Sequence, residues 1–86
     1  MTAPLPPLAP RAWLRWDLVD RLVAELRPAT ILEIGCGQGS MGARLARRAD
    51  YLAVEPDPDS YAVAEARVAA SGGTVLAADH TGVPAG

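Results

Sequence analysis

The chain has 86 residues, half of them apolar, a net charge of -2 and a single cysteine. This length allows one small domain or part of one. The charge gives no support for nucleic-acid binding, and one cysteine excludes an internal disulfide. No apolar run is long enough to cross a bilayer, and the N-terminus lacks the pattern of a signal peptide, so we expect a cytoplasmic protein without a membrane partner.

Residues 1–10 form a proline-rich arm that contains Pro4, Pro6, Pro7 and Pro10. Proline interrupts the hydrogen bonding of helices and sheets, so we expect this arm to be extended and flexible. A polyproline ligand for a partner domain is the alternative. The sequence therefore predicts that the folded unit comprises residues 11–86.

A helical pattern follows from about Ala12 to Arg27 and ends before Pro28. Leucines recur every four residues in it, at Leu14, Leu18, Leu22 and Leu26, and Val19 and Val23 widen this apolar stripe. Charged residues fall largely on the opposite side, so the leucines predict the apolar face of an amphipathic helix. Trp13 and Trp16 stand at its start, where we interpret them as core or domain-contact aromatics. A lid over a substrate is the alternative interpretation.

The next stretch combines a strand pattern with a glycine-rich turn. Residues 31–34 are a short aliphatic run interrupted only by Glu33, typical of a strand buried on both faces. Gly35, Gly37 and Gly39 follow at alternate positions. Glycine accepts positive φ and lets the backbone approach a ligand, and a following helix directs free N–H groups at that ligand. This layout is typical of a nucleotide-cofactor site at the mouth of an α/β sheet.

Two other features near the turn have competing interpretations. Cys36 has no second cysteine nearby, so we interpret it as a small residue in a tight turn and not as a nucleophile or metal ligand. The expected helix from Met41 to Arg48 carries three arginines, Arg44, Arg47 and Arg48. We expect them to face solvent, with an acid-binding patch as the alternative.

The second predicted strand, residues 51–54, ends at Glu55, which Pro56 follows. Glu55 lies about twenty residues after the first glycine, where a carboxylate commonly binds the hydroxyls of a ribose. Asp57 is the predicted cap of the next helix, and Gly72 with Gly73 ends that helix.

The third predicted strand, residues 74–78, leads to Asp79 and His80. Asp79 is an acid at the carboxyl end of a third parallel strand, beside the expected cofactor site. We interpret His80 as a residue at the rim of that site or in an exposed loop, with a general base as the alternative.

Two glycine patterns overlap at the turn. Residues 37–42 match G-x-G-x-x-G, the dinucleotide fingerprint. Residues 33–39 read E-x-G-x-G-x-G, which resembles the first motif of class I S-adenosylmethionine-dependent methyltransferases. A carboxylate at the base of the turn would repel a pyrophosphate, whereas S-adenosylmethionine carries an ammonium and a sulfonium. Glu33 therefore favours S-adenosylmethionine as the cofactor.

This resemblance implies an α/β fold, namely the N-terminal half of a Rossmann-like doubly wound parallel sheet with strand order 3-2-1. It implies transfer of a methyl group to an unidentified acceptor, and a role for Asp79 in holding the adenine amino group. The cofactor-binding residues that it implies are Glu33, Gly35, Cys36, Gly37, Gly39, Glu55, Pro56, Asp79 and His80. Neither a metal site nor a catalytic residue is implied.

In the family the sheet continues beyond the third strand, and the acceptor site lies there. We therefore expect a cofactor-binding half that is inactive alone, either cut short or completed by another chain. Self-association through the open edge of the first strand is also expected. Two alternatives remain: an NAD(P)-binding half-domain of an oxidoreductase, opposed by Glu33 and Asp79, and a non-catalytic cofactor-binding or assembly module.

Overall fold

Alternating helices and strands build one parallel sheet in the computed structural model, which describes residues 4–79 and residue 81. The elements are α1 (Pro10–Leu26), β1 (Thr30–Ile34), α2 (Ser40–Leu45), β2 (Asp50–Val54), α3 (Pro58–Ala69) and β3 (Thr74–Leu76). In the sheet β2 lies between β1 and β3. The predicted α/β fold and strand order are confirmed.

The sheet is parallel throughout, and its register places side chains of like orientation side by side. Leu32 lies opposite Leu52, which lies opposite Thr74. Within the described residues β1 pairs only with β2, so its other edge has no strand beside it.

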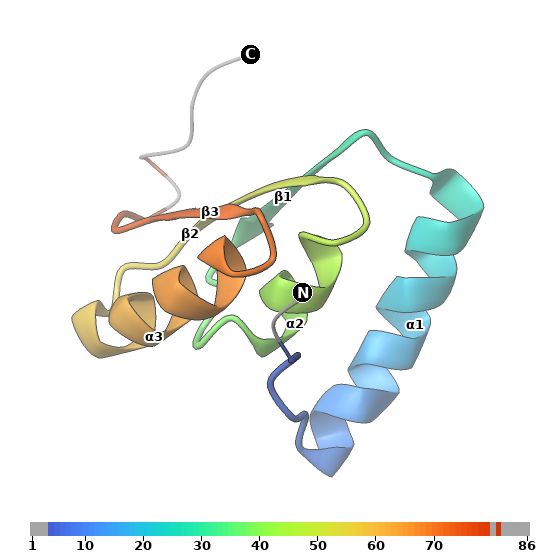
Figure 1. Ribbon diagram of the computed structural model, residues 1–86, viewed down its shortest axis with the longest axis horizontal. Coiled ribbons are helices and arrows are strands. Elements are labelled where there is room, and N and C mark those ends of the chain that lie inside the picture. The colour runs from blue at the N-terminus through green and yellow to red at the C-terminus, as the bar shows by residue number, and fades with distance from the viewer. Residues whose placement is uncertain (1–3, 80, 82–86) are drawn as a thin grey trace.

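All three helices lie on one side of the sheet (Figure 1). The core between helices and sheet consists of Leu45, Tyr51, Ala53, Ala64, Val68 and Val75. Ala53, Ala64 and Val68 are completely buried. A Cβ atom on Gly73 would lie 2.6 Å from a methyl of Val68, so glycine there allows the chain to enter β3 close to α3.

The opposite face of the sheet carries no helix among the described residues (Figure 1). Leu32 is 50% exposed and Ile34 is 59% exposed on that face. The aliphatic pattern of β1 is typical of a strand buried on both faces, but burial on the second face requires a second layer of structure. The partial burial of β1 is therefore the result expected for a chain that carries only half of the sheet.

Helix α1 stands at one end of the helix layer, beyond α2 (Figure 1), and has no buried residue. It contacts the core through Trp16, Val19 and Val23. The four leucines of the predicted apolar face are 47–79% exposed. The prediction is therefore right for Val19 and Val23 and wrong for the leucines, because apolar residues surround much of this helix and its position at the edge decides which of them pack. Trp16 does reach the core, as predicted.

The ends of the other two helices follow local sequence signals. Asp57 accepts a hydrogen bond of 2.8 Å from the Ser60 N–H, and Pro58 is the first residue of α3. The predicted cap is confirmed. Helix α2 is shorter than predicted. Arg44 is buried, and its guanidinium lies over the ring of Trp13 and donates to the Ser40 carbonyl at 2.9 Å. The expectation that Arg44 faces solvent is thus wrong.

The N-terminal arm contains no helix or strand over residues 4–9. Leu8 is nevertheless buried. Residues 4–7 line a hollow together with Ala66 and Arg67 of α3 and with Ala70, the residue that follows α3. This part of the arm therefore follows the surface of α3.

Candidate functional site

The glycine turn between β1 and α2 has the predicted backbone. Gly35, Gly37 and Gly39 have φ of 75°, 59° and 79°. A Cβ atom on Gly35 or Gly37 would meet nothing within 4 Å, whereas one on Gly39 would lie 3.0 Å from the Cα of Ala64. The first two glycines therefore shape an open concave turn, and the third allows the turn to touch α3.

Hydrogen bonds attach this turn to the neighbouring elements. The Gly35 N–H donates to the Val54 carbonyl of β2 at 2.9 Å. Arg67 of α3 donates to the Gln38 carbonyl at 3.3 Å and to the Ser40 hydroxyl at 3.2 Å. The turn is consequently held from two sides, which limits the ordering that a ligand must impose on it.

Glu55 holds the same turn from the end of β2, and only 7% of the residue is exposed. Its Oε1 accepts the Gly37 N–H at 2.7 Å, and its Oε2 accepts the Asp57 N–H at 2.9 Å. Each carboxylate oxygen accepts two hydrogen bonds. Glu55 therefore fixes the turn and retains capacity to accept from the hydroxyls of a ribose.

Glu33 lies half-buried on the side of β1 that faces the helices. The Tyr51 hydroxyl donates a hydrogen bond to its Oε1. Among the described residues no basic side chain forms an ion pair with Glu33. A carboxylate removed from water with only a neutral donor has charge left uncompensated. The arrangement is therefore suited to a cation.

Cys36 lies between these two acids. Burial, then the charge of Glu33, then that of Glu55 raise the pKa of its thiol to about 11. Because a thiol is a nucleophile only when ionised, Cys36 is inert at neutral pH. The structure thus supports the interpretation of Cys36 as a small residue in a tight turn. No group of three potential metal ligands occurs in residues 4–79 and 81.

Asp79 follows β3 at the carboxyl end of the sheet, the same end as Glu55. Its Oδ1 accepts the Thr81 N–H at 2.9 Å, and the side chain is exposed. Pro56 is exposed next to Glu55. His80 lies outside the described residues. The sheet therefore brings Glu33, Glu55 and the glycine turn together, with Asp79 at the end of the outer strand.

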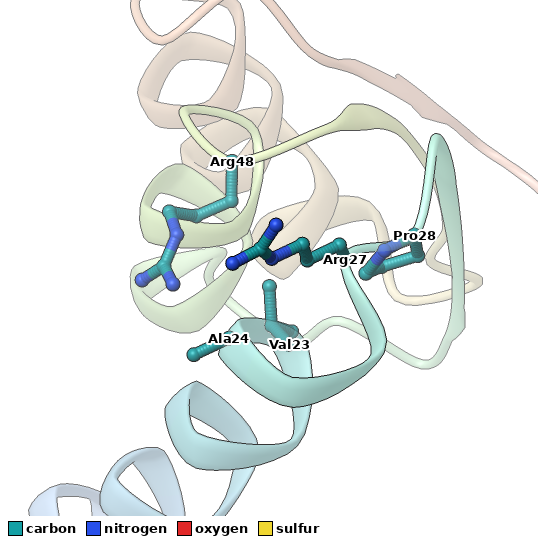
Figure 2. Close-up of a pocket in the computed structure, with 5 residues that line it drawn as sticks. All are labelled: Val23, Ala24, Arg27, Pro28 and Arg48. Carbon is teal, nitrogen blue, oxygen red and sulfur yellow. The ribbon is translucent and has the colours of Figure 1, made fainter.

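A separate hollow of about 340 Å³ lies where α1 ends (Figure 2). It is lined by Val23, Ala24, Arg27, Pro28 and Arg48, and Arg27 extends across it toward Arg48. Arg48 forms an ion pair with Asp20 of α1. None of the candidate cofactor-binding residues lines this hollow.

Sequence reasoning missed Tyr51 and left Gly42 as part of the dinucleotide pattern that it did not favour. A Cβ atom on Gly42 would lie 2.6 Å from the Tyr51 hydroxyl oxygen. The last glycine of the dinucleotide pattern is therefore explained by the packing of Tyr51. A tyrosine at the start of a predicted buried strand was the available signal, because a buried hydroxyl needs a partner.

The fold and the candidate site are those of an α/β cofactor-binding unit, and comparison of the sequence with known protein families gives its family. A family model described as a methyltransferase domain matches residues 31–85, which is more than half of the chain. The chain therefore belongs to the methyltransferase domain family, and the resemblance is confirmed.

A solved structure supports the same assignment. It is a TehB-like SAM-dependent methyltransferase from Corynebacterium glutamicum, 25% identical to this chain, with a TM-score of 0.59. The match covers 80% of this chain and 42% of that protein, so the chain spans less than half of its length. No curated protein matches this sequence significantly. In the described part of the chain no helix is long and apolar enough to cross a membrane.

Proposed function

We propose that this chain is the cofactor-binding part of an S-adenosylmethionine-dependent methyltransferase, which acts in the cytoplasm on an unidentified acceptor. The observation that carries the proposal is Glu33, a half-buried carboxylate that accepts a hydrogen bond from the neutral Tyr51 hydroxyl and forms no ion pair within the described residues. It lies beside a turn built to approach a ligand. A cationic cofactor supplies the missing charge, whereas a pyrophosphate would be repelled.

The residues of the site fit S-adenosylmethionine. Glu33 would bind its α-ammonium, Glu55 the two ribose hydroxyls, and Asp79 the adenine amino group. Gly35 and Gly37 leave the open turn against which the cofactor would lie. When bound, S-adenosylmethionine supplies an electrophilic methyl group, and the contribution of these residues is to hold and orient it.

Gly42 does not separate the dinucleotide alternative from S-adenosylmethionine. The third glycine of the dinucleotide fingerprint allows close packing of helix and strand, and Gly42 packs closely against Tyr51 of β2. Glu55 serves either cofactor. Glu33 and Asp79 have no counterpart role in a dinucleotide site, so the two acids separate the alternatives.

Calorimetry of the 86-residue chain with S-adenosylmethionine and with NAD tests the cofactor. We expect binding of S-adenosylmethionine only, and Glu33→Gln should weaken it by roughly 1.5–3 kcal/mol because a charge-assisted contact is lost. Glu25→Gln, an equal charge change on exposed α1, is the matched control. Preference for NAD, or unchanged affinity in Glu33→Gln, would contradict the proposal.

We further propose that strands beyond β3 complete the enzyme, because β1 has an open edge and an uncovered apolar face. An apolar strand edge recruits another chain, so the isolated chain should self-associate. Size-exclusion chromatography measures this, and Ile34→Lys should reduce it by placing charge beside the edge. Ala62→Lys, at an exposed position of α3, is the control. A monodisperse wild-type monomer that melts cooperatively would instead indicate a self-sufficient binding module.

A further inference from the structure

Tyr51 is a core side chain that forms a hydrogen bond with an acid of the candidate site. Its residue is 5% exposed, and its hydroxyl donates to Glu33 Oε1. Burial, the hydrogen bond to Glu33 and the charge of Glu33 raise the pKa of Tyr51 far above its ordinary value. The phenol therefore stays protonated and remains a hydrogen-bond donor at every physiological pH.

Two glycines make the room that this ring occupies. A Cβ atom on Gly42 would lie 2.6 Å from the Tyr51 hydroxyl oxygen, and one on Gly73 would lie 3.1 Å from a ring carbon. Glycine inside a helix is less favourable than alanine. Its presence in α2 is accounted for by the place of the hydroxyl, so the chain is shaped around this hydrogen bond.

The hydrogen bond from Tyr51 restrains the side chain of Glu33. A glutamate side chain rotates freely unless it is held, and ordering it on ligand binding costs entropy. Tyr51 donates to Oε1, which restrains the rotation of the carboxylate and, among the described residues, leaves Oε2 without a hydrogen-bond partner. A carboxylate held in this way is ready to meet a cation.

We propose that Tyr51 is a positioning residue of the cofactor site: by donating to Oε1 it orients Glu33 so that Oε2 receives the α-ammonium of S-adenosylmethionine. This inference rests on the proposed function. Tyr51 touches no part of the cofactor itself and acts through Glu33.

The test uses two thioethers that differ only in the amino-acid part, S-adenosylhomocysteine and 5′-methylthioadenosine. Tyr51→Phe should weaken S-adenosylhomocysteine roughly five- to tenfold, which corresponds to one hydrogen bond, and leave 5′-methylthioadenosine unchanged. Tyr61→Phe is the matched control, because it removes the hydroxyl of a partly buried tyrosine that also packs against the core. Equal weakening of both ligands by Tyr51→Phe would show a merely structural role and overturn the proposal.

A double-mutant cycle with Glu33→Ala tests whether Tyr51 acts through Glu33. In the Glu33→Ala background, Tyr51→Phe should not change the preference for S-adenosylhomocysteine any further. Additive losses would overturn the proposal. Gly42→Ala displaces the hydroxyl while retaining it, and should reproduce the selective loss if Tyr51→Phe folds poorly.

If the proposed function is wrong, the same binding measurements give a different result. A wild-type chain that binds neither thioether, or shows no preference for S-adenosylhomocysteine, would contradict both the function and the positioning role. A preference that survives Tyr51→Phe in a folded chain would leave the function standing and overturn only the role of Tyr51.

Discussion

The two acids beside the glycine turn are the same residue type in different environments. Glu55 accepts two backbone N–H groups, from Gly37 and Asp57, and is 7% exposed. Glu33 accepts one neutral hydroxyl from the Tyr51 side chain. Glu55 therefore belongs to the architecture of the turn, whereas Glu33 retains charge for a ligand. Substitutions should separate these two contributions, folding at Glu55 and cofactor recognition at Glu33.

The largest effect is expected for Glu55→Ala. It leaves two backbone donors near the turn without their acceptor, so unfolding in urea should show a loss of about 3 kcal/mol. S-adenosylmethionine and S-adenosylhomocysteine should weaken together, because both carry the same ribose. Glu65→Ala on the exposed side of α3 is the control. A variant that loses one ligand and retains the other would show that Glu55 acts elsewhere.

A smaller effect on folding is expected for Glu33→Gln. The amide oxygen still accepts from Tyr51, so the free energy of unfolding should change by less than about 1 kcal/mol, despite the loss of cofactor affinity. Urea unfolding of this variant beside Glu55→Ala measures the contrast directly. Equal losses of stability in the two variants would remove the distinction between the acids.

The smallest effect is expected on the reactivity of Cys36, because the charges of Glu33 and Glu55 both raise the pKa of its thiol. Its pKa is raised from 9.0 to about 11, chiefly by burial and then by Glu33 and Glu55. Alkylation by iodoacetamide should therefore be slow at neutral pH and accelerate as the pH rises toward that value. Glu33→Gln should increase the rate severalfold at pH 9, and Glu55→Gln should increase it less. If Glu55→Gln increased the alkylation rate more than Glu33→Gln, the charge of Glu55 would have the larger influence on the Cys36 thiol.

Local sequence patterns were sufficient for the backbone of the site. The glycines at 35, 37 and 39 have the positive φ that their spacing indicates, and Asp57 caps α3 as its type and position predict. The alternation of helices and short apolar strands also indicated a parallel sheet, whereas the strand order was implied by the family resemblance. These features depend on residues close together in the chain, so the sequence alone determines them.

Packing partners could not be predicted in the same way. Trp16, Val19 and Val23 of α1 pack against the core as expected, but the leucines expected beside them are exposed, and Arg44 is buried where a surface residue was expected. The bond from Tyr51 to Glu33 joins residues on two strands. Periodicity shows that a helix or strand has an apolar side. Which side packs, and which acid receives a partner, depends on segments far away in the chain, so only the tertiary structure decided it.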